Sequence, residues 1–160
     1  MQHGNARIEF DDCLGAIKDF TQVIKINPHD ANPFLCHGEA YTVIENYENA
    51  VSDCSRAIKI DPSCIDAYFS RGYALNQKGD KRGSLSNYNQ VIKLDPKYIS
   101  AYIQRGDIRK DKGEKEEAIA DLQSLLYKES MLNEIRVLQA EIKQIWDEIK
   151  NTPWWQKRVF

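Results

Sequence analysis

The apolar residues of this chain recur at the spacing of an α-helix. A run from Ala67 to Lys78 predicts one helix, and Gly79-Asp80 predicts a turn after it. The apolar face of a second helix follows, with residues three or four positions apart: Leu85, Tyr88, Val91 and Ile92. No segment alternates apolar and polar residues as a strand would, so the pattern predicts an all-α fold.

This two-helix pattern repeats with a period of 34 residues. Three prolines share the period, each after a similar apolar segment: Pro28, Pro62 and Pro96. Four glycines and the small residues twelve positions after them also share it: Gly4, Gly38, Gly72 and Gly106, then Ala16, Ala50, Ser84 and Ala118. Because independent positions have one period, we predict four stacked helix–turn–helix units.

The repeated prolines and glycines have different physical roles. Asp61 and Asp95 precede prolines, and such residues avoid the α region, so the second helix of each unit should end there. A glycine inside a helix costs about 1 kcal/mol relative to alanine. Its recurrence in every first helix predicts close packing against the small residue of the second helix.

These residues resemble the tetratricopeptide repeat family, whose 34-residue unit has an aromatic residue, then glycine, tyrosine, alanine, an aromatic residue and proline. The second unit has Phe34, Gly38, Tyr41, Ala50 and Pro62; the third has Tyr68, Gly72, Tyr88 and Pro96; the fourth has Tyr102, Gly106 and Ala118. The fourth departs at Arg109 and Leu122, where aromatics are expected, and at Ser130, where proline is expected. The resemblance covers residues 1–128 and implies an α-solenoid, a right-handed superhelix whose concave groove binds other polypeptides.

The resemblance divides the array into units 1–30, 31–64, 65–98 and 99–128. The first unit is truncated, because Gly4 follows only three residues. We expect its first helix to lack the opening turn. Either the natural chain starts raggedly, or this sequence is a fragment of a longer one, which we favour because terminal repeats usually have a polar cap.

Residues 129–150 form a separate predicted helix. The apolar phase of the fourth unit ends at Glu129 and Asn133, and a new stripe runs through Met131, Ile135, Leu138, Ile142, Ile145 and Ile149. We expect this helix to cap the exposed face of the fourth unit. The heptad spacing leaves a dimeric coiled coil open as the alternative, and one long helix over 114–150 is a further possibility.

Residues 151–160 form an aromatic and basic tail. It has Trp154, Trp155 and Phe160, with two basic residues between them. We predict that one of the tryptophans is buried against protein, because exposed aromatics at a terminus are unfavourable. The tail can fold back beside Trp146, dock in the groove of its own or a neighbouring molecule, or act as a partner-binding or membrane-interface motif.

Composition narrows the function. Among 160 residues, 22 are basic and 24 acidic, which gives a net charge of −2 and argues against nucleic acid or an anionic membrane as the partner. No long apolar run or signal sequence is present, so we expect a cytoplasmic protein. The four cysteines lack C-x-x-C spacing and should be reduced and apolar in role. Cys36 beside His37 is a weak thiol–imidazole candidate, since adjacent helical residues point apart. We predict no catalytic residues, no metal and no cofactor.

In the resembled family, the first helices line the groove. Its apolar row would comprise Leu35, Phe69 and Ile103, and Tyr73 would add a second aromatic ring beside it. The polar residues on the same wall would be Glu39, Asp66, Ser70, Asn76, Gln104 and Asp107. The alternative is that the large residues only pack between neighbouring helices.

The groove charges predict the kind of partner. Some family members hold the acidic C-terminus of chaperones with a clamp of Lys, Asn, Asn, Lys and Arg. The corresponding residues here are Met1, Asn5, Cys36, Asp66 and Ser70, or one unit later Leu35, Glu39, Ser70, Ser100 and Gln104. This is no clamp. We therefore predict a non-catalytic scaffold, a monomer or weak homodimer, that binds a protein segment with apolar anchors and a basic residue. The alternatives are self-assembly through Ile135, Leu138, Ile142, Ile145, Trp154, Trp155 and Phe160, or the repeat portion of a larger enzyme or regulator.

Overall fold

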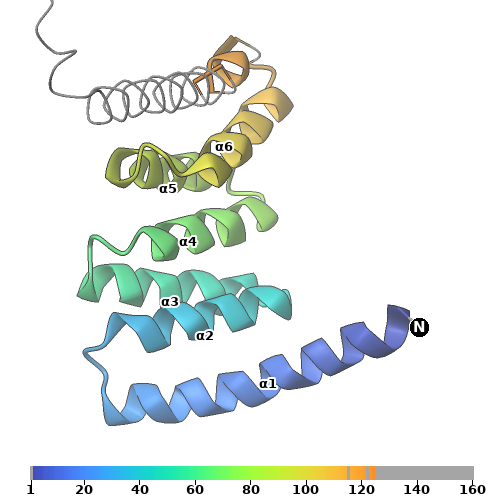
Figure 1. The fold of residues 1–160 in the computed structure, drawn as a ribbon, viewed down its shortest axis with the longest axis vertical. Helices are drawn as coiled ribbons and strands as arrows, with labels where there is room; N and C mark the ends of the chain where they lie inside the picture. The colour runs from blue at the N-terminus through green and yellow to red at the C-terminus, as the bar shows by residue number, and fades with distance from the viewer. Residues whose placement is uncertain (1, 115, 122, 125–160) are drawn as a thin grey trace, which may run out of the picture. The chain divides into compact units, whose positions relative to one another are not determined.

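A computed structural model describes residues 2–114, 116–121 and 123–124, with side chains from residue 12 onward. Its helices are α1 (Gln2–Ile26), α2 (Ala31–Val43), α3 (Tyr47–Ile60), α4 (Ile65–Gln77), α5 (Lys81–Leu94) and α6 (Ile99–Asp111). Residues 116–121 and 123–124 are also helical. Figure 1 shows α1 to α6 stacked in chain order. The described residues contain no strand, which confirms the predicted all-α fold of stacked helix pairs.

Helices pack as pairs and then as a stack. α2 packs on α3 and α4 packs on α5, and these pairs lie within the predicted units 31–64 and 65–98. Successive pairs contact one another through α3 and α4, and through α5 and α6. The chain divides into two compact units, Met1–Asp121 and Leu122–Phe160, and the helices α1 to α6 all belong to the first.

The turn inside each helix pair has one left-handed residue at a fixed repeat position. Glu45, Gly79 and Gly113 have φ angles of 60°, 85° and 80°. Glycine adopts this conformation without a steric cost, whereas Glu45 incurs one because it has a Cβ. The next residue caps the following helix in two of the turns: Oδ1 of Asp80 accepts a hydrogen bond from N of Gly83 at 2.9 Å, and Asn46 does the same for Asn49.

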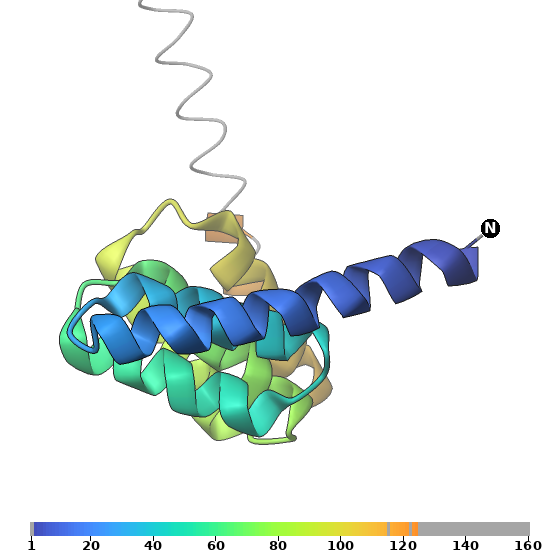
Figure 2. The same ribbon diagram turned by 90° about the horizontal axis from the view of Figure 1, so that it is seen from below.

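The first unit differs from the predicted helix pair. The corresponding turn position is Asp11, and α1 runs through it as one helix of 25 residues. The physical reason is a local competition. The segment before Asp11 is shorter than isolated helices need to be stable, whereas a continued helix gains one hydrogen bond per residue. Figure 2 shows the N-terminal part of α1 extending beyond the other helices.

One face of α1 is therefore less covered than in later units. Val23, Ala57 and Val91 occupy the same repeat position on α1, α3 and α5. Ala57 is fully buried in the core with Phe34 and Ala67, and Val91 with Ala101 and Ile108, whereas Val23 is 42% exposed.

The repeated glycines face the second helix of their unit, but only Gly38 lies close to the predicted small residue. A Cβ at Gly38 would lie 2.9 Å from Sγ of Cys54 and 3.2 Å from the carbonyl oxygen of Ala50. At Gly72 the close atoms belong to Tyr88 and Asn87, and at Gly106 the carbonyl of Ala118 is at 3.7 Å. The missing side chain thus lets the paired helix approach, most tightly in the second unit.

The helix ends follow the prolines. Asp61 and Asp95 close α3 and α5 in extended conformations, as pre-proline residues should. Among the described residues, no helix has both the length and the apolar character needed to cross a membrane. The predicted helix 129–150 and the tail 151–160 lie outside the described residues and stay predictions.

Candidate functional site

Two neighbouring first helices each carry an exposed carboxylate that accepts a hydrogen bond from a hydroxyl group. Glu39 on α2 and Ser70 on α4 are joined by a 3.3 Å hydrogen bond, in which the hydroxyl donates to Oε1 of Glu39. Asp66 lies one helical turn before Ser70 on α4, and its Oδ1 accepts a 3.3 Å hydrogen bond from the hydroxyl of Tyr98, just before α6. Glu39 and Asp66 are both exposed. The first helices thus present an acidic surface that runs from α2 to the start of α6.

The pKa values of this surface show that its charges interact. Desolvation raises the pKa of Glu39, the hydrogen bond from Ser70 opposes the rise, and the charge of Asp66 adds to it. The pKa of Tyr98 rises to about 12, first because its ring is desolvated and then because Asp66 and Glu39 disfavour a phenolate. A cation placed here would relieve the repulsion between the two carboxylates.

An aromatic cluster adjoins the acids. The ring centroid of Phe69 lies 5.1 Å from that of Tyr98 and 5.5 Å from that of Tyr88. Phe69 and Tyr73 are both half-buried on α4. Tyr98 belongs to both groups, because its ring contacts Phe69 while its hydroxyl bonds to Asp66. This position thus combines apolar surface with negative charge.

The remaining predicted groove residues have different surroundings. Ile103 is 42% exposed on α6, and Asp107 is exposed one turn later. Asn76 and Gln104 are half-buried. The sequence predicts Leu35 in the same apolar row, but its side chain is only 9% exposed and packs in the core with Phe34, Ala57 and Ala67. For Leu35 the packing alternative therefore holds.

A polar contact that the sequence analysis did not find joins three helices. Nδ1 of His37 on α2 lies 2.8 Å from Oδ2 of Asp53 on α3. Its Nε2 lies 3.3 Å from the hydroxyl of Thr21 on α1. The imidazole thus lies between α3 of its own unit and α1 of the preceding unit.

The same contact recurs in the next two units with arginine in place of histidine. Nε of Arg71 donates to Asn87 at 2.9 Å and its Nη1 to Ser55 at 3.2 Å. Nε of Arg105 donates to Asp121 at 3.0 Å and its Nη1 to Asn89 at 2.6 Å. Every member is 34 residues from its counterpart, which was the signal available in the sequence. We call these three contacts the polar relay and assign it to holding successive units in register.

The cysteines and other potentially reactive side chains of the described region do not gather into one site. All four cysteines are free, and burial raises the pKa of Cys54 to about 12. Sγ of Cys36 lies 4.0 Å from Oδ1 of Asn32, whereas the ring nitrogens of its neighbour His37 contact Asp53 and Thr21. Within the described residues, no three His, Cys, Asp or Glu side chains gather as a metal site.

Sequence comparison decides the family of this helical array. The pattern described as TPR repeat matches residues 72–113, and that described as tetratricopeptide repeat matches residues 37–64. The chain contains tetratricopeptide repeats. These matches lie within the second, third and fourth predicted units and include the repeated glycines Gly38, Gly72 and Gly106. No curated protein sequence matches the chain.

Solved tetratricopeptide structures share the fold. A MamA structure from Desulfovibrio magneticus RS-1 is 20% identical with a TM-score of 0.71, over 81% of this chain and 73% of that one. The first such domain of Spaghetti (RPAP3), bound to the HSP90 peptide SRMEEVD, is 22% identical with a TM-score of 0.64, over 70% and 89%. The domain of Arabidopsis OM64 is 24% identical with a TM-score of 0.62, over 67% and 88%. At these identities the likeness concerns the fold alone.

Proposed function

We propose that this chain is a non-catalytic protein-interaction module that binds a segment of a partner protein along α2, α4 and α6. The observation that carries the proposal is that the charges of Glu39 and Asp66 interact, and that Tyr98 joins Asp66 to the half-buried ring of Phe69. Helical repeats of this family are protein-interaction scaffolds, and the RPAP3 domain binds a peptide. The four free cysteines fit a reducing compartment, so we place the module in the cytoplasm.

The chemistry of this surface favours a basic partner. A lysine or arginine between Glu39 and Asp66 would neutralise two carboxylates whose charges disfavour one another. A neighbouring apolar side chain would pack on Phe69, Tyr73 and Ile103. Asn76 and Gln104 would offer amides to the backbone of the segment. Asp107 would extend the negative surface along α6.

A selection from a random peptide library tests the proposal, because it lets the surface choose its own ligand. We expect the full chain to enrich peptides with lysine or arginine two to four positions from a bulky apolar residue. The variant Glu39→Gln/Asp66→Asn removes both charges and keeps the side-chain shapes, so it should lose this enrichment. Lys78→Gln/Lys81→Gln is a matched surface control and should keep it. Enrichment of acidic peptides, or equal enrichment by the charge-neutral variant, would show that the proposed site is wrong.

A further inference from the structure

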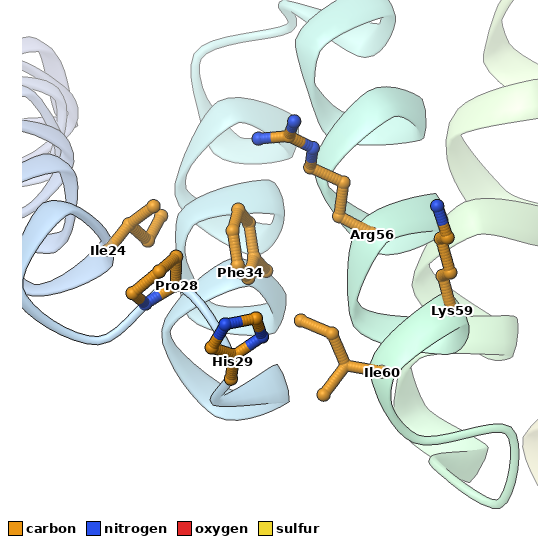
Figure 3. A pocket seen from close by; sticks show the side chains of 7 residues that line it. All are labelled: Ile24, Pro28, His29, Phe34, Arg56, Lys59 and Ile60. Atoms are coloured by element: carbon orange, nitrogen blue, oxygen red, sulfur yellow. The ribbon is translucent and has the colours of Figure 1, made fainter.

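A pocket of about 500 Å³ opens on a different part of the array. It lies between the end of α1, the loop that joins α1 to α2, and the second half of α3. Figure 3 shows the α1 and loop residues on one side, the α3 residues on the other and Phe34 of α2 between them. The volume is within the range of roughly 300–1,000 Å³ that is typical of ligand pockets.

The lining combines an apolar floor with a basic rim. The apolar residues are Ile24, Pro28, Phe34 and Ile60, and the basic or imidazole-bearing residues are His29, Arg56 and Lys59. The guanidinium carbon of Arg56 lies 5.5 Å from the centroid of the Phe34 ring, which orients the positive charge over the floor. The lining includes no carboxylate.

The carboxylates nearest in sequence to the pocket are engaged elsewhere. Asp30 caps α2 by accepting a 3.0 Å hydrogen bond from N of Asn32. Asp61 accepts 2.9 Å and 2.6 Å hydrogen bonds from N and Oγ of Ser63, which lower its pKa. Asp53 lies 2.8 Å from His37 in the polar relay.

Arg56 and Lys59 are therefore open to a ligand. Arg56 favours the ionised form of Asp53 through its charge, since it opposes the raised pKa of that carboxyl. Among the ion pairs found in the described part of the chain, however, neither Arg56 nor Lys59 takes part. Both side chains are exposed.

The next unit does not repeat this chemistry. Thirty-four residues later, serine replaces His29, tyrosine replaces Phe34 and glutamine replaces Arg56, and only the lysine is kept: Ser63, Tyr68, Gln90 and Lys93. In the fourth unit, the tyrosine at this position donates its hydroxyl to the carbonyl of Pro96, a contact that phenylalanine cannot make. The basic, apolar pocket is thus specific to the junction of α1, α2 and α3.

We propose that this pocket binds an acidic peptide segment of a partner protein, with one bulky apolar side chain on the floor and flanking carboxylates paired with Arg56 and Lys59. The inference goes beyond the proposed function, because the charge is opposite to that around Glu39. Phe34 and Glu39 are five residues apart on α2 and so point about 140° apart around the helix. The array would then hold a basic segment on one face and an acidic segment on another.

Nuclear magnetic resonance titration with four capped pentapeptides tests the inference on the full chain. EEFEE has a phenylalanine between glutamates, and KKFKK keeps the phenylalanine and reverses the charge. We expect EEFEE to shift amide signals around Ile24, His29, Phe34 and Lys59 at millimolar concentration. KKFKK, QQFQQ and EEAEE, which lack either the negative charges or the aromatic ring, should bind at least about fivefold more weakly, the effect of losing an exposed ion pair or a buried anchor.

Variants taken from the repeat itself keep the fold intact. Arg56→Gln copies the residue at position 90 and should weaken EEFEE binding about fivefold. Phe34→Tyr copies position 68 and should weaken EEFEE binding, because the added hydroxyl narrows the apolar floor of the pocket. Lys93→Gln, at the equivalent of Lys59 in the next unit, is the matched control and should leave binding unchanged.

The outcomes separate this inference from the proposed function. Glu39→Gln/Asp66→Asn should leave EEFEE binding intact, so failure of the acidic surface does not remove the pocket. The inference is overturned if EEFEE shifts no signals, if its shifts map to α4 and α6, or if Arg56→Gln and Phe34→Tyr bind EEFEE as tightly as the unmodified chain.

Discussion

Nδ1 of His37 lies 2.8 Å from Oδ2 of Asp53, at the repeat position where the next two units place an arginine. The polar relay is thus the same arrangement of contacts in three units, with an imidazole in one unit and a guanidinium in the other two. A guanidinium is always charged and reaches two acceptors in a fixed geometry. At the junction of α1, α2 and α3 the same position instead has an imidazole, which presents one ring nitrogen to each of two partners.

His37→Arg should stabilise the array. Burial raises the pKa of Asp53, and the charges of His37 and Arg56 oppose that rise. Because the folded-state pKa of this carboxyl is raised, its ionisation costs the folded protein free energy as the pH rises through that value. A permanent guanidinium would reduce the cost and raise the free energy of unfolding by about 1 kcal/mol at pH 7. Between pH 4 and pH 7, the free energy of unfolding measured with urea should fall less in His37→Arg than in the unmodified chain.

The reverse exchange serves as the control. Arg71→His should lower the free energy of unfolding, because its guanidinium bonds to both Asn87 and Ser55. Equal stability of both exchanged variants and the unmodified chain would mean that the relay does not hold the units in register.

Two glycines at one repeat position should respond oppositely to alanine. At Gly38 a Cβ would lie 2.9 Å from Sγ of Cys54 and 3.2 Å from a backbone oxygen, so Gly38→Ala should destabilise the fold. At Gly106 the nearest contacts are 3.7 Å and 3.9 Å, so Gly106→Ala should gain up to about 1 kcal/mol of helix propensity. Thermal unfolding followed by circular dichroism would contradict the packing account if the signs were reversed.

The exposed face of α1 makes a third prediction. Val23 is 42% exposed, whereas Val91 at the same repeat position is fully buried. Val91→Ala should cost about 2 kcal/mol of unfolding free energy because it leaves a cavity, and Val23→Ala should cost less than about 1 kcal/mol. Similar losses in urea unfolding would show that α1 is covered as fully as α5.

The repeat architecture could be predicted because it depends on local signals that recur. Glycine and a small residue mark each unit, proline marks the first three, and the structure places Gly38 and Asp61 in the predicted roles. The first unit could not be predicted as one helix from the same signals, since its outcome depends on a balance between a turn at Asp11 after a very short first helix and one continued helix. The repeated residues alone do not show which of these two conformations is more stable.

Contacts between helices were harder to predict than the helices. Offsets from the glycine led to Glu39 and Ser70, which do meet across α2 and α4. The same offsets did not reveal that Leu35 is buried in the core, because its exposure depends on Phe34, Ala57 and Ala67 around it. The basic pocket escaped notice because Arg56 and Lys59 lie on a second helix, outside the predicted groove.

Binding of a basic peptide to the first helices should depend on pH. Desolvation and Asp66 raise the pKa of Glu39, so its carboxylate is protonated at a higher pH than that of an ordinary glutamate. As the pH is lowered, the affinity for a lysine-containing peptide should therefore fall. The fall should begin at a pH above the one at which an ordinary glutamate is protonated. The Glu39→Gln variant should have a shallower pH profile. A pH-independent affinity measured by fluorescence anisotropy would exclude Glu39 as a ligand of the peptide.

The central claim is that the charges of Glu39 and Asp66 select a basic segment beside Phe69. Calorimetric titration of one library-selected basic peptide into the unmodified chain and into Glu39→Gln/Asp66→Asn tests it most directly. The account predicts that the dissociation constant rises at least about tenfold in the variant, as for two charge pairs of about 0.7 kcal/mol each. The dissociation constant of the unmodified chain should also rise with salt concentration, and the variant should lose this dependence. Equal dissociation constants, with the helical circular dichroism of both proteins unchanged, would contradict the account.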